Sequence, residues 1–231
     1  MKKSAGQLLL CGGLMLFIGT NSSAATIDIA LVIDSSGSMD ADRRSRVLEF
    51  SSSLVTSFNA FEATSEHEYR FGVIQFGGYT STATVEYSFI DEQALSAVTY
   101  TIDNLAQMNG YTPTALAVET AMNLFASDSI NSFNQHMFII TDGVPTRSSD
   151  PCLLMPTGLS TTVIAVDLAV DSTNIECLVN NPSTDIIEMA SFSQSDVNAI
   201  NAELTAVPLP AAAWLFGTGS IILAGLLRRK A

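Results

Sequence analysis

Apolar residues form four near-continuous runs along the middle of the chain. The runs lie at 27–33, 71–76, 137–140 and 163–166. Apolar runs of this length, without polar alternation, are typical of strands that are covered on both faces of a parallel sheet. Two weaker strands are predicted, one at 82–88 after the Gly77-Gly78 turn and one at 186–189.

Helical spacing fills the gaps between these runs. Apolar positions three and four apart follow the first run at Val47, Phe50, Leu54 and Phe58, and a second set precedes the third run at Leu116, Ala117, Thr120, Ala121 and Leu124. A last helix is predicted at 196–204, capped by Ser195 or Asp196. The alternation of strands and helices predicts an α/β doubly wound fold.

The first 25 residues have the three parts of a secretory signal peptide. Lys2 and Lys3 precede an apolar stretch at 8–18, and small residues follow at 22–25. Cleavage is expected after Ala24 or Ala25. The alternative is an uncleaved membrane anchor, but the apolar stretch is short for a span. The sequence therefore predicts an exported protein.

The last 25 residues form a second signal, at 207–231. An apolar run at 212–227 is followed by Arg228-Arg229-Lys230, and the positive-inside rule places this basic cluster in the cytoplasm. The run is preceded by Val207, Pro208, Leu209, Pro210 and Ala211. This tail resembles the VPLPA type of PEP-CTERM sorting signals, and the resemblance implies processing by an exosortase. The alternative is a plain single-pass membrane helix.

The remaining residues, 26–206, suit one domain with a sizeable core. They contain five arginines, no lysine and all 23 acidic residues of the chain. Such a charge disfavours nucleic acid and anionic lipid as partners and attracts cations, although solubility in a salty medium explains it equally well.

Cysteine usage agrees with export. Cys11 leaves with the signal peptide, so Cys152 and Cys177 remain as the only pair, and we expect a disulfide between them. The alternatives are two free thiols or a soft-metal site, for which nearby histidines are missing.

Oxygen-bearing side chains stand where predicted strands end. Asp34-Ser35-Ser36-Gly37-Ser38 follows the first run, Asp142 follows the third, and Thr112 lies in the loop Gly110-Tyr111-Thr112-Pro113-Thr114. Together they offer the ligands that a small divalent cation prefers. The three segments, in this order, resemble the metal-ion-dependent adhesion site of the von Willebrand factor A domain family.

The resemblance covers about 27–206 and implies a sheet of order 3-2-1-4-5-6 with the third strand antiparallel. It implies Mg²⁺ as the metal, with Mn²⁺ or Ca²⁺ possible, and not all ligands in direct contact at once. The implied ligands are Asp34, Ser36, Ser38, Thr112 and Asp142. Thr114 is the alternative to Thr112, although its position after Pro113 favours the first turn of a helix. Asn109 replaces a glycine that is frequent in the family loop.

Each ligand also has a simpler interpretation. Ser36 and Ser38 could cap a helix, and Asp142 could form a turn with Gly143. Asp40 and Asp42, which flank the first motif, are expected to be solvated acids of a first helical turn.

A hydrolase is the competing enzyme interpretation. Ser36 as a nucleophile would need a base, but His67 and His136 both lack the sequence context of a catalytic base and are expected at the surface or at a strand edge. The segment 147–160 is expected either to form a specificity rim around the metal or to serve as a stapled connection.

The expected function is binding rather than catalysis. The sequence predicts an exported module that engages an acidic group of a protein or glycan partner through its metal, at the surface or in the matrix of a Gram-negative-type bacterium. The alternatives are a matrix component with a purely structural metal and, less favoured, a metal-assisted hydrolase.

Overall fold

The computed structural model describes residues 25–64, 67–90, 93–127, 134–143, 146, 151–153, 159–167 and 175–205. The predicted signal peptide, apart from Ala25, and the predicted sorting signal lie outside these residues. Within the described part of the chain, no helix is long and apolar enough to cross a membrane.

Six strands form one sheet in the order β3-β2-β1-β4-β5-β6. The pair β2 and β3 is antiparallel and all other neighbouring strands are parallel. The predicted fold class, the strand order and the antiparallel third strand are therefore confirmed. The strands are β1 Ala25–Asp34, β2 His67–Gly77, β3 Thr82–Tyr87, β4 Asn134–Thr141, β5 Ser160–Ala165 and β6 Ile186–Glu188.

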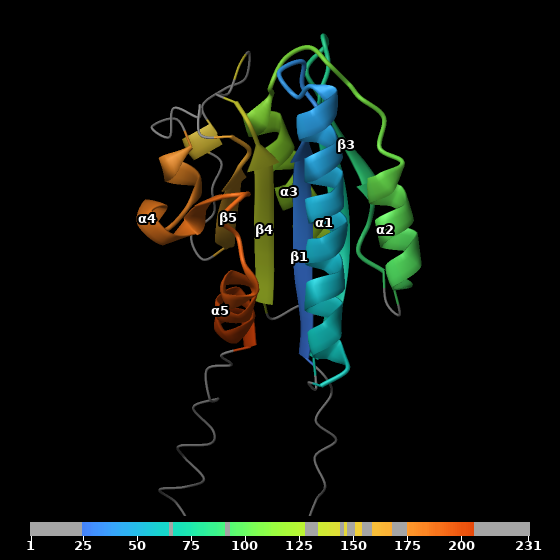
Figure 1. The fold of residues 1–231 in the computed structure, drawn as a ribbon, viewed down its shortest axis with the longest axis vertical. Helices are drawn as coiled ribbons and strands as arrows, with labels where there is room; N and C mark the ends of the chain where they lie inside the picture. The colour runs from blue at the N-terminus through green and yellow to red at the C-terminus, as the bar shows by residue number, and fades with distance from the viewer. Residues whose placement is uncertain are drawn as a thin grey trace, which may run out of the picture.

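Helices cover both faces of the sheet, with α1 in front and α3 behind in the view of Figure 1. The residues of α1, α2 and α5 share one core with one face of the sheet, and those of α3 share a second core with the other. The helices are α1 Ala41–Glu62, α2 Leu95–Asp103, α3 Thr114–Ser127, α4 Pro182–Asp185 and α5 Gln194–Thr205, with short 3₁₀ turns η1 Pro151–Leu153 and η3 Glu176–Leu178.

The central strand β1 is apolar on both sides because it contributes to both cores. Ile29, Leu31 and Ile33 pack on the α1 side, while Ala30 and Val32 pack on the α3 side. Alternate residues of a strand point to opposite faces, so a strand with two covered faces has no position left for a solvated side chain. This explains the near-continuous apolar run of the sequence.

One buried ion pair interrupts the apolar interior. Asp28 of β1 lies beside Arg70 of β2 in the parallel register, and both side chains are at most 1% exposed. Arg70 Nε donates to Asp28 Oδ1 at 2.8 Å, and Nη2 donates to Oδ2 at 2.9 Å. The forked contact satisfies both carboxylate oxygens, as a buried charge pair requires.

Two helices differ from the sequence predictions. The helix α2 was not predicted. The helix α5 begins at Gln194, so a cap at Ser195 or Asp196 is wrong; Asp196 instead accepts a hydrogen bond from the backbone N–H of Ser193 at 2.7 Å. An acidic side chain that reaches back to the residue before the helix is one half of a capping box.

Candidate metal site

The predicted ligands gather at the carboxyl ends of β1 and β4. Asp34 is the last residue of β1, Asp142 directly follows β4, and the two strands are neighbours in the sheet. The order of connections reverses between these strands, which is where open α/β sheets bind their ligands. In Figure 1 the carboxyl ends of these strands are at the upper end of the sheet.

The loop between β1 and α1 folds back on its first residue. Asp34 Oδ1 accepts a hydrogen bond from the Ser36 N–H at 2.8 Å, so the carboxylate holds the turn closed. The cap of α1 is Asp40, whose Oδ1 accepts from the Arg43 N–H at 2.9 Å. Ser36 and Ser38 therefore do not cap this helix. Asp40 and Asp42 are exposed, as predicted, but only Asp42 lies in the first turn, since Asp40 is the cap.

Hydrogen bonds connect four of the five predicted ligands with one another and with the carboxyl end of β4. Ser36 Oγ and Ser38 Oγ lie 3.0 Å apart, and Ser38 Oγ donates to Asp142 Oδ1 at 2.7 Å. Asp34 Oδ2 accepts from Thr141 Oγ1 at 2.7 Å, which joins the ends of β1 and β4. Asp34, Ser36 and Asp142 are buried, while Ser38 is exposed. The set thus combines buried carboxylates with one hydroxyl open to solvent.

Thr112 approaches the same place from the loop before α3. A Cβ added to Gly143 would lie 3.6 Å from Thr112 Oγ1 and 3.7 Å from Ser38 Oγ, so the two hydroxyls border one small space beside this glycine. The backbone of Thr112 is fixed by Thr146, whose Oγ1 accepts from the Thr112 N–H at 2.8 Å and whose N–H donates to the Thr112 carbonyl at 2.9 Å.

The alternative donor Thr114 is the first residue of α3, as expected. It is fully buried, and its Oγ1 has no hydrogen-bond partner among the residues that the structure describes. Thr112 is the one that borders the space beside Gly143.

The loop that carries Thr112 keeps its shape without the second glycine. Asn109 has φ 58° and Gly110 has φ 70°, and asparagine is among the residues that best tolerate the left-handed region. A Cβ on Gly110 would lie 2.4 Å from backbone atoms of Gly78 and Tyr79, so only this position strictly needs glycine. The loop is tied to the β1–α1 loop, since the Gly37 N–H donates to the Gly110 carbonyl at 3.0 Å.

Burial makes Asp34 the electrostatically unusual member of the set. Desolvation raises the pKa of its carboxyl group from 3.8 to about 6, against the opposing effect of the hydrogen bonds from Thr141 and Ser36. A desolvated carboxylate is stabilised by taking up either a proton or a cation. Asp34 therefore has a physical reason to favour a bound metal at neutral pH.

The donor set fits a hard cation. It comprises two carboxylates and three hydroxyls, and within the described ranges no group of three or more His, Cys, Asp or Glu side chains is placed to hold a metal. Oxygen donors suit Mg²⁺, Mn²⁺ or Ca²⁺ better than soft metals. In this set Asp34, Ser36, Ser38, Thr112 and Asp142 would hold the ion; their coordination of a metal stays a prediction.

Two side chains at the site were missed by the sequence analysis. Arg43 of α1 donates to Asp142 Oδ2 at 3.2 Å and to the Ser38 carbonyl at 3.0 Å. Gln107 Nε2 donates to the carbonyls of Ser36 and Met39 at 2.9 and 3.0 Å and so supports the β1–α1 loop from outside. The contacts of Arg43 with Asp142 and of Gln107 with the β1–α1 loop could not be predicted from a local pattern, because their partners lie 68 to 99 residues apart in the chain.

The two histidines lie near the amino ends of their strands, at the opposite end of the sheet from the metal site. His67 is the first residue of β2 and His136 the third of β4, whereas Ser36 follows the carboxyl end of β1. The prediction of a surface or strand-edge position is wrong for His136, which is 1% exposed and bonded to Ser160 Oγ and Thr162 Oγ1 at 3.0 and 3.1 Å. Burial lowers its pKa to about 3, so it is neutral.

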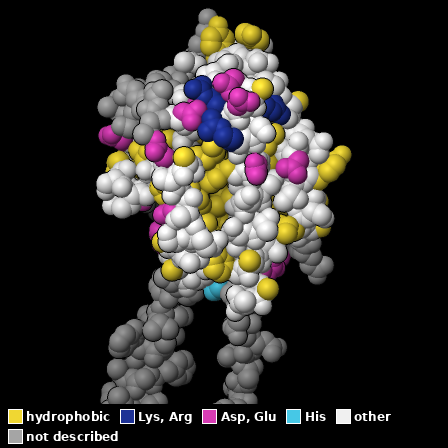
Figure 2. Space-filling view, viewed as in Figure 1, with side chains coloured by type: hydrophobic (Ala, Val, Ile, Leu, Met, Phe, Trp, Pro, Cys, Tyr) yellow, Lys and Arg dark blue, Asp and Glu magenta, His cyan; other side chains and the backbone are white. Residues whose placement is uncertain are grey.

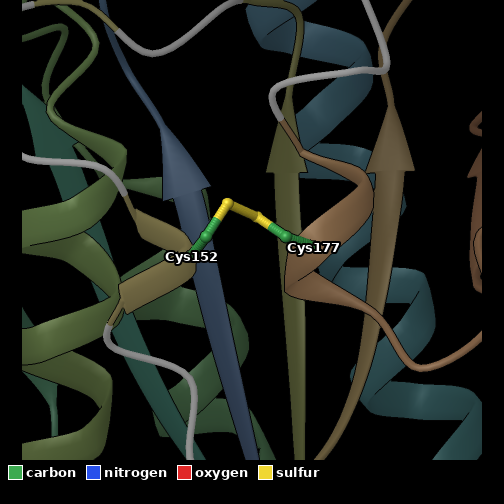
Figure 3. Close-up of a disulfide and its surroundings, with 2 residues drawn as sticks. All are labelled: Cys152 and Cys177. Atoms are coloured by element: carbon green, nitrogen blue, oxygen red, sulfur yellow. A yellow bond between two sulfur atoms is a disulfide. The ribbon is translucent and has the colours of Figure 1, made fainter.

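The structure contains the predicted disulfide between Cys152 and Cys177. Figure 3 shows it joining η1 to η3, and residues beside it in η3 belong to the core on the α3 side of the sheet. Most of the segment 147–160, including Arg147, lies outside the described residues, so its predicted role as a rim or a connection stays open.

Comparison with known proteins assigns the domain. The sequence model of the von Willebrand factor type A domain matches residues 28–205. Integrin alpha-E of Homo sapiens is 29% identical over 124 residues, which are 52% of this chain and 10% of the integrin. The collagen alpha-1(VI) chain of Gallus gallus is 24% identical over 163 residues, 68% of this chain and 16% of the collagen chain. The chain thus spans a small part of these relatives.

A solved structure has the same fold. Proximal thread matrix protein 1 from the mussel byssus, with a zinc-occupied MIDAS motif, superposes with a TM-score of 0.61 at 18% identity over 78% of this chain and 46% of its own. At this identity the likeness concerns the fold alone.

Proposed function

Because the chain belongs to the von Willebrand factor type A domain family, we propose that it is a metal-dependent binding module. The domain holds a divalent cation, Mg²⁺ by preference, and through it engages an acidic group of a protein or glycan partner. The residues that hold the ion are Asp34, Ser36, Ser38, Thr112 and Asp142.

The single observation that carries this proposal is the balance of donors at the site. Three of the five side chains are neutral hydroxyls, and the exposed Ser38 leaves the site accessible from solvent. Two carboxylates only balance the charge of a divalent ion, and neutral hydroxyls are weak donors, so the ion stays electron-poor and can accept a further carboxylate oxygen. Asp34 and Asp142 would bind the ion by charge, and the three hydroxyls would add oxygen ligands without adding negative charge. Gly143 leaves room between Ser38 and Thr112.

Capture of the partner tests the proposal. The full-length chain should retain an acidic partner from native matrix in the presence of Mg²⁺ and release it when a chelator removes the metal. The exchange of Asp42, an exposed acid outside the site, for Asn should leave this behaviour unchanged, whereas the exchange of Asp34 for Asn should abolish it. Retention of the partner in chelator would instead favour the second candidate, a matrix component with a purely structural metal.

A metal-assisted hydrolase is less well supported. Neither histidine is close to Ser36 along the sheet, and His136 already uses both ring nitrogens in hydrogen bonds. A nucleophilic serine needs an adjacent base. Turnover of acyl or phosphoryl esters that is lost in Ser36→Ala would support the hydrolase against the binding module.

Export and sorting complete the proposed function. The N-terminal segment 1–25 supports secretion, the motif at 207–211 supports recognition by an exosortase-type enzyme, and the apolar run at 212–227 supports a membrane-held precursor. Named relatives include an integrin and a collagen chain. Their similarity supports an exported protein, and we propose that the mature form resides at the surface or in the extracellular matrix of its bacterium.

A further inference from the structure

The solvent-accessible arginines of the described residues gather at the start of α1, beside the metal site. Arg43, Arg44 and Arg46 all lie in the first two turns of α1, and Arg70 is buried in the ion pair with Asp28. Figure 2 shows the dark blue side chains over the upper end of α1, among acidic side chains. This placement is unusual on a strongly acidic domain, because a cation next to a metal site opposes metal binding.

Arg43 is the one that reaches the predicted ligands. Its Nη1 donates to Asp142 Oδ2 at 3.2 Å and to the Ser38 carbonyl at 3.0 Å, and its side chain is 32% exposed. The Asp142 side chain is only 2% exposed, and its other oxygen accepts from Ser38 Oγ at 2.7 Å. The guanidinium therefore supplies the positive charge that this buried carboxylate needs when it is ionised.

A second acid holds Arg43 from the opposite side. Arg43 Nε donates to Asp167 Oδ2 at 2.8 Å, and Asp167 lies just after β5 with φ 59°. Asp167 also accepts from Arg46 Nη1 and Nη2 at 3.2 and 3.1 Å. One guanidinium is thus shared between an acid that belongs to the predicted metal site and an acid that does not. Such a cation can leave the first acid without losing all of its partners.

We propose that Arg43 is a built-in competitor of the metal, which neutralises Asp142 in the metal-free protein and shifts toward Asp167 when a divalent cation binds. The inference rests on the proposed metal site and goes beyond it, because a residue that is not a ligand then lowers the affinity of the site for the metal. Asp167 then acts as the acceptor that makes the release of Asp142 possible. If Arg43 instead held Asp142 in the position needed for metal binding, its removal would weaken metal binding.

The test is a double-mutant cycle of Mg²⁺ affinity by isothermal titration, made on the full-length chain at one pH and one ionic strength. Arg43→Met should tighten Mg²⁺ binding about tenfold, since the positive charge that competes for Asp142 is removed. Asp167→Asn should weaken binding about threefold, because Arg43 is then held by Asp142 alone. In the Arg43→Met background the same exchange at Asp167 should have little effect.

Arg46→Met is the matched control. It removes the same charge from the same helix and touches Asp167 but is not bonded to Asp142, so we expect a change of no more than about twofold. Thermal melting adds an independent readout: without metal, Arg43→Met should melt lower than the wild type, and saturating Mg²⁺ should close most of this gap.

The outcomes separate the two claims. If the wild type binds Mg²⁺ and loses it in Asp34→Asn, but Arg43→Met binds equally or more weakly, the competitor role is wrong and the proposed metal site stands. If neither the wild type nor Arg43→Met binds a divalent cation, both claims fail. Tighter binding in Arg43→Met, together with the loss of the Asp167→Asn effect in that background, supports both.

Discussion

At the scale of single residues, the protonation of Asp34 gives the site a pH dependence. Its carboxyl group has a pKa of about 6, raised by burial, and a metal ion needs the ionised form. The affinity for Mg²⁺ should therefore rise by up to about tenfold per pH unit below pH 6 and level off above it. Titrations between pH 5 and 8 check this expectation, and an affinity that does not change across that range would contradict it.

The raised pKa of Asp34 should also make the free energy of unfolding of the metal-free protein depend on pH. The folded-state pKa lies above the ordinary value of 3.8, so the folded protein keeps a proton that the unfolded chain releases between these two values. The contribution of Asp34 to the free energy of unfolding therefore falls as the pH rises from about 4 to 6. Asp34→Asn should remove this slope, which isolates it from the other acids.

Single residues also mark the limit of what the sequence could predict at the site. Five ligand candidates are implied by the family resemblance of three motifs, two of which follow apolar runs, and the structure brings four of the five into a short hydrogen-bonded set with Thr112 nearby. The contact between Arg43 and Asp142 could not be predicted, since it depends on the packing of α1 beside the end of β4. Whether Asn109 can replace a glycine in the loop depends on its φ, which the sequence does not reveal.

At the scale of elements, the apolar runs predicted strands, and the weaker strands predicted at 82–88 and 186–189 are also present, as β3 and β6. The four runs became β1, β2, β4 and β5, because strands covered on both faces leave an unmistakable pattern. The helix α2 was missed because only Val98 and Ile102 of its nine residues are buried. His136 was misplaced because polar residues at the start of a run do not reveal that neighbouring hydroxyls satisfy them.

The pairing of β1 with β2 should depend on the buried ion pair. Arg70→Met leaves the Asp28 carboxylate without its forked partner in the interior and should lower the free energy of unfolding by about 3–5 kcal/mol. The exposed pair of Arg46 and Asp167 is the control, and Arg46→Met should cost much less, because solvent screens this pair. Urea denaturation measures both, and equal losses would show that burial does not decide the strength of these pairs.

At the scale of the whole molecule, an acidic domain lies between two segments that the sequence predicts to be export signals. If the motif at 207–211 is processed, the protein recovered from outside the cells should lack the apolar run and Arg228-Arg229-Lys230, since two prolines keep the peptide extended and accessible. Intact-mass measurement of the native protein decides this. Material that still ends at Ala231 in a host with an active exosortase would indicate a plain membrane helix.

The fold and the site also meet at this scale, because the switch point of the sheet is where the ligand residues gather. The central claim, a divalent cation held by Asp34 and Asp142, is tested most directly by isothermal titration of Mg²⁺ into the wild type, Asp34→Asn, Asp142→Asn and the exposed control Asp42→Asn. We predict saturable binding in the wild type and in Asp42→Asn, and a loss of at least about a hundredfold in the two site variants, with their folds intact by circular dichroism. Wild-type affinity in both site variants would contradict the account.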